Sequence, residues 1–381
     1  MKIEIIGKFY SNHSLSIVNR NLAIELDKKG LDVFITPIDS FVHDQKLDLE
    51  QVKVLKRLES NSTAEPDIQI RHSYPPMWRY PVSDKTKVIY IQPWEYSKTP
   101  HEWVQKWESF ADAVITPSRW TADKYLNAGV NPRKVFVIPN GYDPSIYNLE
   151  KEQSEFFDSK RFTFLFVGMH QARKGLDILL NVWKDCFVRA DNVQLFIKDT
   201  PQIYGQNNLL SEILKMQYHT DCGKIIYNSD TLSDREMANI YKNSKVVVHP
   251  YRGEGFGMHV QEATACGALP IITAGGPTDE FIPDGVGLKI ESQRQHVDLT
   301  SPDLFAIKPG DSLSGMGEHG WILEPNPAAL KHHMRVLYSH HERKKFFEQV
   351  ALYENPNTWS RVGDLYTEAI KVIYDRPHTQ R

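Results

Sequence analysis

The stretch KIEIIGKFYSNHSLSIVNRNLAIELDKKGLDVFITP, residues 2–37, decides the fold class. Residues 2–7 form a short apolar segment that is typical of a buried strand. Residues 14–30 repeat apolar side chains on one helical face and end in Gly30, a helix stop signal. Residues 31–37 are a second apolar segment. Strand, helix and strand in this order predict a parallel sheet with right-handed crossovers.

The same alternation continues along the chain in two halves. A polar and charged stretch, residues 145–161, separates them, and a second series of strands and helices opens at residue 162. We therefore expect an α/β protein of two Rossmann-like domains, residues 1–150 and 153–355. The first strand ends at Gly7, and no G-x-G-x-x-G pattern follows it. A nicotinamide-type dinucleotide site at this end is therefore unsupported.

The composition excludes several classes of protein. The 381 residues are 41% hydrophobic and carry a formal net charge of -3, so no overall basic field attracts nucleic acid. Three cysteines, Cys186, Cys222 and Cys266, fit neither a disulfide framework nor a zinc site. No apolar run reaches the roughly 18 residues of a membrane-spanning helix, and the first residues make a poor signal peptide. We expect a cytoplasmic protein, with a peripheral membrane contact and the oligomeric state left open.

A glycine-rich loop in the second half, YRGEGFGMHVQE at residues 251–262, indicates where a ligand binds. It follows an apolar strand and leads into a helix near Met258. Glycines allow close approach to the backbone, and the helix start favours a phosphate. Glu254 must then reach a neutral hydroxyl-bearing group, while Glu262 lies on the helix where it can accept hydrogen bonds from a vicinal diol. Together they predict a nucleotide sugar. The alternative interpretation is a plain turn with two solvated glutamates.

A second loop, FVGMHQARKGLDILL at residues 166–180, supports the same site. Arg173, Lys174 and Gly175 stand at the start of the helix that follows the first strand of the second half. Two cations and a helix N-terminus can stabilise a leaving diphosphate. The alternative is an exposed basic turn.

These motifs together resemble the retaining glycosyltransferases of the GT-B fold, family 4, which carry an E-x7-E signature. The resemblance rests on residues 254–262, on ATACGALPIITAGG at 263–276 and on VGMHQARKG at 167–175, and also on VIPNGYDPSIY at 137–147 and TPSRWTADKYLNAGV at 116–130. It covers about residues 115–360. It implies two facing Rossmann-like domains with a central cleft, and a C-terminal helix, about residues 358–381, that crosses back to the N-terminal domain.

The resemblance also implies a role for each matched position. Glu254 should bind hydroxyls of the donor sugar, Glu262 the ribose diol and Lys174 the β-phosphate. The backbone N–H groups that should face the diphosphate belong to Gly255, Phe256 and Gly257. The chain departs from the family where Met169 replaces a phosphate-binding arginine, whose role passes to Arg173 or is lost, and where His259 replaces a proline.

The N-terminal half of the family supplies the acceptor site and a polar group near the anomeric carbon. Glu95, in YIQPWEYSKTPHEW, is our candidate for that group, and His72 is the alternative. Glu95 has a competing interpretation as a cap of the helix after Pro100, and His72 as a strand-end histidine whose hydrogen bonds are satisfied. Backbone amides near Ser14 should approach the phosphates from this side.

The expected function is transfer of a hexose-type sugar from a UDP-, GDP- or ADP-sugar to a hydroxyl of a glycan, a lipid-linked or a small-molecule acceptor, with retention. The chain has no D-x-D triplet, the usual metal handle of the other main glycosyltransferase fold, so we expect no metal and no cofactor. The alternatives are another GT-B enzyme, such as a sugar-nucleotide epimerase or a phosphorylase, and a non-catalytic nucleotide-sugar-binding protein.

Overall fold

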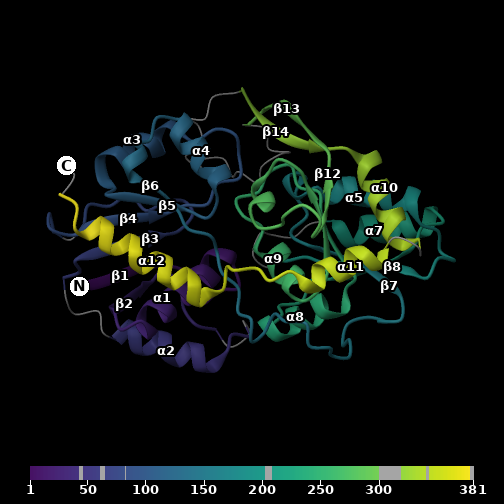
Figure 1. The fold of residues 1–381 in the computed structure, drawn as a ribbon, viewed down its shortest axis with the longest axis horizontal. Helices are drawn as coiled ribbons and strands as arrows, with labels where there is room; N and C mark the ends of the chain where they lie inside the picture. Colours follow the sequence, from purple (N-terminus) through teal and green to yellow (C-terminus); the bar gives the residue numbers. More distant parts are fainter. Residues whose placement is uncertain are drawn as a thin grey trace. The chain divides into compact units, whose positions relative to one another are not determined.

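The computed structural model describes residues 1–42, 46–60, 65–81, 83–201, 208–299, 319–339 and 343–377. The chain divides into two compact units (Figure 1). Unit 1 contains Met1–Asp143 and Pro356–Arg381, and unit 2 contains Pro144–Ile307 and Glu318–Asn355; a further segment of unit 1, Lys308–Gly317, lies outside the described residues. Both ends of the chain thus belong to unit 1.

Unit 1 is built on a six-stranded parallel sheet in the order β2-β1-β3-β4-β5-β6. The strands are β1 (Lys2–Gly7), β2 (Asp32–Pro37), β3 (Ile68–His72), β4 (Lys87–Ile91), β5 (Ala113–Thr116) and β6 (Val135–Val137). β3 and β4 are buried at every position. β4 is mostly apolar, whereas β3 (IQIRH) also buries polar side chains, which hydrogen-bond one another: the Arg71 guanidinium donates to Oε1 of Gln69 over 2.8 Å. The parallel sheet predicted from residues 2–37 is confirmed.

Among the described residues of this unit, five α-helices accompany the sheet. They are α1 (Ser14–Lys28), α2 (Leu49–Ser60), α3 (His101–Phe110), α4 (Arg119–Asn127) and α12 (Trp359–Tyr374). The C-terminal helix α12 lies along α1 (Figure 1), where the Lys29 ammonium is 2.6 Å from the Asp364 carboxylate. A Cβ on Gly363 would lie 2.9 Å from the Cβ of Glu25, so only glycine allows this close approach. The helix expected to cross back to the N-terminal half does so.

Unit 2 repeats the architecture with the strand order β12-β11-β10-β7-β8-β9, again parallel. The strands are β7 (Phe162–Val167), β8 (Val193–Lys198), β9 (Lys224–Asn228), β10 (Val246–His249), β11 (Leu269–Thr273) and β12 (Leu288–Ile290). The helices are α5 (Leu176–Cys186), α7 (Leu209–His219), α8 (Asp234–Asn243), α9 (Met258–Ala265), α10 (Pro327–Tyr338) and α11 (Arg343–Leu352). Two parallel α/β sheets confirm the predicted fold class.

An antiparallel hairpin stands between β12 and α10. β13 (Ser292–Asp298) pairs with β14 (His319–Pro325), and residues 300–318 between them lie outside the described part of the chain. The hairpin is anchored at the carboxyl edge of the unit 2 sheet, because the amide of Leu323 donates to the carbonyl of Arg252 over 2.9 Å. It therefore meets the glycine-rich loop that the sequence singled out.

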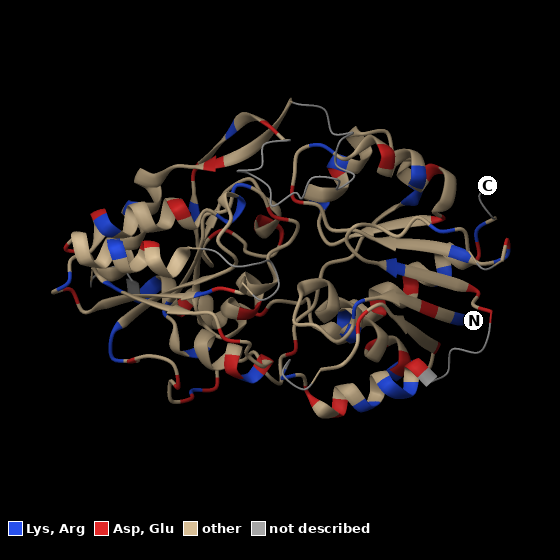
Figure 2. Cartoon of the chain, turned by 180° about the vertical axis from the view of Figure 1, so that it is seen from behind, with Lys and Arg blue, Asp and Glu red and all other residues tan. Residues whose placement is uncertain are grey.

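The tryptophans of unit 1 serve mainly as core. Trp94, Trp103 and Trp107 are each at most 1% exposed and stack edge to face in a chain. Core packing, rather than carbohydrate stacking, is thus their use. Charges of both signs are interspersed along the helices of each unit (Figure 2), in keeping with the small net charge. In the part of the chain that the structure describes, no helix is long and apolar enough to cross a membrane.

Candidate active site

The glycine-rich loop lies where the sequence placed it, between the carboxyl end of β10 and the start of α9. Gly257 is the N-cap of α9 with φ of 97°, a left-handed conformation that favours glycine. Glu254 is only 7% exposed although it stands in a loop. The alternative of a plain turn with solvated glutamates is therefore wrong for Glu254.

The second loop meets the first directly. The amide of Arg252 donates to the carbonyl of Arg173 over 2.7 Å, and the Arg173 guanidinium donates to the carbonyl of Gly253 over 3.0 Å. Gly175 has φ of 72°, and a Cβ there would overlap the carbonyl oxygen of Pro250. The two loops form one continuous surface because a glycine allows their backbones to touch.

Charges converge on one oxygen of Glu254. Its Oε2 is 2.5 Å from the Lys174 ammonium, 3.0 Å from Nε2 of His249 and 3.9 Å from the Arg173 guanidinium. Burial alone would raise the pKa of Glu254, but the Lys174 charge, the His249 hydrogen bond and the Arg173 charge together hold it well below its ordinary value. Glu254, Lys174 and Arg173, predicted from separate loops, thus form one ionised cluster.

Arg252 holds this arrangement from the side, and no motif in the sequence predicted that role. Its guanidinium forms paired hydrogen bonds with Asp177 at the start of α5, at 2.8 and 2.9 Å, and with Glu324 of β14, at 2.6 and 3.1 Å. It also donates to the carbonyl of Ala172. One side chain therefore joins the two loops and the hairpin.

Glu262 lies apart from that cluster, in contact with α8. It is 8% exposed and accepts a hydrogen bond from the Tyr241 hydroxyl over 3.1 Å. Burial, followed by the negative charge of Asp234, raises the pKa of Glu262 to about 8. Tyr147, from the stretch expected to be a polar linker, packs on the Tyr241 ring. Tyr147 and Tyr241 are the supports of Glu262 that the sequence missed.

The other matched positions of the two loops include Gly255, Phe256 and Met169, which are buried as well. The amide of Gly255 donates to Oε1 of Glu254 over 3.1 Å, so it must exchange that partner to bind a diphosphate. Phe256 packs on Phe281 with ring centroids 4.8 Å apart. Met169, at the position of the family's arginine, is 8% exposed and belongs to the apolar core.

In unit 1, the carboxyl ends of β1 and β3 carry a neutral polar cluster. Nδ1 of His72 is 2.8 Å from Oδ1 of Asn19, and the Asn19 amide donates to the carbonyls of His72 and Lys8. A Cβ on Gly7 would overlap Asn19 and the His72 carbonyl. Nε2 of His72 is buried and has no hydrogen-bond partner among the described residues, so the interpretation of a fully satisfied histidine is wrong.

The histidines of this cluster are uncharged at neutral pH. Burial lowers the pKa of His72 to about 3, with a smaller contribution from nearby His13, and it lowers that of His13 to about 4. His13 caps α1 by accepting the amide of Leu15 over 3.1 Å. Ser14, the first residue of α1, is exposed.

Glu95 follows β4 in the same unit and is partly exposed. α3 begins after Pro100, whose own side chain makes no cap hydrogen bond. The interpretation of Glu95 as a cap of this helix stays a prediction. Ser14 and Glu95 thus follow the carboxyl ends of β1 and β4, and His72 is the last residue of β3.

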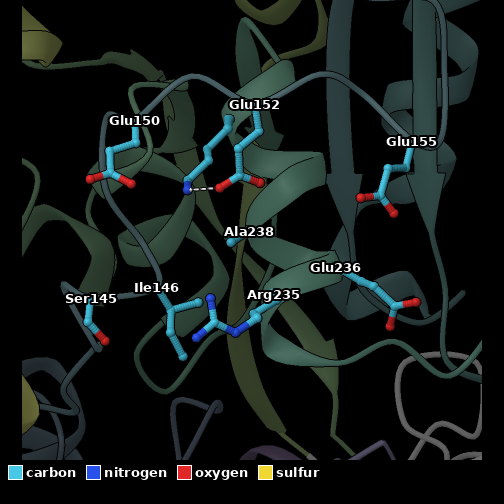
Figure 3. Close-up of a pocket in the computed structure, with 9 residues that line it drawn as sticks. Ser145, Ile146, Glu150, Glu152, Glu155, Arg235, Glu236 and Ala238 are labelled. Atoms are coloured by element: carbon cyan, nitrogen blue, oxygen red, sulfur yellow. Dashed lines mark hydrogen bonds and ion pairs between the residues drawn. The ribbon is translucent and has the colours of Figure 1, made fainter.

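A separate cavity of about 330 Å³ lies between residues 145–155 and α8, away from both loops. Its lining includes more carboxylates than cations, and Figure 3 shows Glu152 paired with Lys242 while Glu150 and Glu155 stand well apart. Its carboxylates would repel a diphosphate. Within the described ranges no group of three or more His, Cys, Asp or Glu residues could hold a metal ion.

Two family models match the chain. "Glycosyl transferases group 1" matches residues 148–300, which contain both loops, and "Glycosyltransferase Family 4" matches residues 65–146. Each model falls almost entirely within one unit. The first contains Glu254, Glu262, Lys174 and Arg173, and the second contains His72 and Glu95.

Individual relatives share only about a quarter of their aligned residues with this chain. The chain is 26% identical over 211 residues to an uncharacterized glycosyltransferase of Methanocaldococcus jannaschii, covering 55% of this chain and 54% of that protein. It is 23% identical over 217 residues to the D-inositol 3-phosphate glycosyltransferase of Actinosynnema mirum, covering 54% of this chain and 52% of that protein. The chain thus matches about half the length of these relatives.

Solved structures share the fold over nearly the whole chain. HepE of Anabaena, solved with UDP and glucose, has a TM-score of 0.61 at 13% identity and covers 98% of this chain and 100% of its own. Sucrose-phosphate synthase of Thermosynechococcus elongatus has a TM-score of 0.64 at 14% identity, covering 98% and 99%. The fold is GT-B, and together with the two family models it supports the assignment of this chain to the group 1, family 4-like glycosyltransferases.

Proposed function

We propose that the chain transfers a hexose-type sugar from a nucleotide diphosphate sugar to an acceptor hydroxyl, with retention at the anomeric carbon and without a metal. The observation that carries the proposal is the ionised cluster of Glu254, Lys174 and Arg173 at the meeting point of two glycine loops. An anion and two cations held side by side suit a ligand that has hydroxyls next to phosphates.

Each group of unit 2 then has a chemical task. Lys174 and Arg173 stabilise the diphosphate as the bond between the anomeric carbon and the phosphate oxygen breaks, and that oxygen takes the electron pair. Glu254 accepts hydrogen bonds from hydroxyls of the sugar. Glu262 accepts them from the ribose diol, where its ionised form binds better than its neutral form.

The acceptor attacks from the face that the diphosphate leaves, so no enzyme nucleophile is needed. The acceptor oxygen bonds to the anomeric carbon, and its proton passes to the departing phosphate oxygen. In unit 1 we propose His72 as the acceptor-side polar group, because its Nε2 has no hydrogen-bond partner among the described residues. Glu95, the candidate taken from the sequence, thereby becomes the alternative. Backbone amides near Ser14 would contact the phosphates from this unit.

The test begins with thermal shifts in EDTA, with UDP, GDP, ADP and their sugar conjugates. Ligands that bind only the folded state raise the melting temperature. We expect one nucleotide family to raise it, and Glu262→Ala to abolish the rise. Glu348→Ala, an exposed glutamate of α11 in the same unit, is the matched control and should keep it. No rise with any nucleotide would contradict the donor site.

Turnover separates the remaining alternatives. Incubation of the bound nucleotide sugar with glycan, lipid-linked and small-molecule acceptors should yield a glycoside whose anomeric configuration, read by NMR coupling, matches that of the donor. An epimerised donor or a sugar phosphate would indicate another GT-B chemistry. Binding without any turnover would indicate a non-catalytic nucleotide-sugar-binding protein.

A further inference from the structure

A buried histidine lies directly beneath Glu254. His249, the last residue of β10, is 0% exposed, and its Nε2 is 3.0 Å from Oε2 of Glu254. Burial is the largest of the effects that lower the pKa of His249 to about 4, so the ring is neutral at neutral pH. Glu254 is ionised and has no proton to donate. Nε2 must therefore carry the hydrogen, and His249 is a neutral donor.

A second histidine packs against the first. The ring of His259 lies 4.2 Å from that of His249 at an interplanar angle of 89°. His249 is buried, and His259 is partly buried. His259 stands where the family 4 glycosyltransferases have proline, and the sequence alone did not indicate what the histidine does. In the fold, its ring contacts His249 edge to face and restricts how the imidazole can turn.

The contacts of Glu254 show what His249 adds. An ionised carboxylate has about four acceptor positions. Oε2 accepts from Lys174 and His249, and Oε1 accepts from the Gly255 amide. The capacity that remains for a further hydroxyl is thus on Oε1. Lys174 is a flexible side chain that a diphosphate would also attract, whereas His249 is enclosed by the core and cannot follow a ligand.

We propose that His249 is a positioning residue that holds the Glu254 carboxylate in the orientation that receives a hydroxyl of the donor sugar on Oε1. The inference rests on the proposed function, because it gives Glu254 the sugar as its ligand. While Lys174 is shared with the phosphates, the His249 N–H keeps Glu254 in place. Loss of that donor should weaken binding of the sugar, whereas the affinity for the nucleotide without its sugar should not change.

Two substitutions separate the hydrogen bond from the packing. His249→Phe keeps the ring contact with His259 and removes the donor, whereas His249→Gln loses the ring and keeps an N–H. Calorimetric titration with UDP and UDP-glucose, and with GDP and GDP-mannose, would measure how much the sugar adds to affinity. We expect His249→Phe to lower affinity for the nucleotide sugar and its kcat/KM about 10- to 100-fold, the effect of losing a hydrogen bond to a charged group.

The other variants define the outcomes. His249→Gln should recover most of that loss, and affinity for UDP or GDP alone should stay within about threefold in both variants. His333→Phe, which alters a half-buried histidine of α10, should change neither affinity. Equal losses in His249→Phe and His249→Gln, or equal losses for nucleotide and nucleotide sugar, would overturn the inference alone. Wild-type protein that binds no nucleotide would overturn the proposed function, and this inference with it.

Discussion

The polar cluster at the carboxyl edge of the unit 2 sheet is charged, whereas the one at the carboxyl edge of the unit 1 sheet is neutral. In unit 2, Glu254 lies 2.5 Å from Lys174, and burial does not prevent its ionisation. In unit 1, His72 is hydrogen-bonded to the uncharged amide of Asn19, and burial keeps its ring neutral. Both edges rely on a glycine that allows close approach, Gly175 in unit 2 and Gly7 in unit 1.

The difference shows how one architecture supports two kinds of recognition. A buried ion pair is costly to desolvate, and we interpret the pair of Glu254 and Lys174 as serving a charged ligand. A buried neutral imidazole with one bare nitrogen suits a hydroxyl group, which can donate to it. The comparison therefore assigns the anionic donor to unit 2 and a neutral hydroxyl acceptor to unit 1, as a proposal that substitutions can break.

The largest effect should follow removal of the cation that pairs with Glu254. Lys174→Met leaves a buried carboxylate without its main partner, and breaking such a pair costs about 3–5 kcal/mol. It also removes the charge that faces the diphosphate. We expect turnover to fall about 100- to 1,000-fold and the melting temperature to fall, both measured beside Lys184→Met at the exposed end of α5. Unchanged turnover would remove the ion pair from the mechanism.

Substitution of His72 in unit 1 should have a smaller effect, and it should act on use of the acceptor rather than on binding of the nucleotide. His72→Phe leaves Oδ1 of Asn19 buried without its donor and removes the bare Nε2. We expect acceptor-dependent turnover to fall about 10- to 100-fold, while the affinity for free nucleotide stays unchanged. His101→Phe, an exposed histidine at the start of α3, is the control. Loss of nucleotide affinity in His72→Phe would contradict the division of roles.

The smallest effect concerns Glu262 and has a defined pH dependence. The pKa of its carboxyl is about 4.5 in the unfolded chain and about 8 in the folded state. Between those values the folded state holds one more proton, so the free energy of unfolding falls as pH rises. Glu262→Gln cannot ionise and keeps an acceptor for Tyr241.

We therefore expect the melting temperature of Glu262→Gln to exceed that of the wild type by a margin that grows from about pH 5 to about pH 8. Nucleotide affinity should fall about tenfold or less, because an amide is a weaker acceptor than a carboxylate. Thermal melts across this pH range measure the first effect and calorimetry the second. A margin that stays constant with pH would show that Glu262 does not titrate in the window.

The sequence predicted the elements of unit 2 well because its motifs are local. Strand, glycine loop and helix start are contiguous, so Glu254 and Lys174 could be placed from spacing alone. Their partners could not. His249 reads as one more residue of a buried strand, and Arg252 joins Asp177 to Glu324 across long sequence separations. Tertiary contacts of that kind leave no periodic signal.

Unit 1 shows the same limit more strongly. The position of His72 at a strand end was evident, but its partner Asn19 comes from α1, in the middle of an ordinary amphipathic pattern. The polar stretch expected to be a linker also carried a buried residue, Tyr147, because one aromatic ring does not alter a composition average.

The placement of α12 has a consequence for how the chain acquires its structure during synthesis. Unit 1 is discontinuous: residues 1–143 leave the ribosome before unit 2, and Pro356–Arg381 leave it only after all of unit 2. Until then the α1 surface at Glu25 and Lys29 has no α12 to cover it. Domains generally fold as units as they emerge. The later-made unit 2 therefore has all its parts before the earlier-made unit 1, which is completed only when α12 emerges.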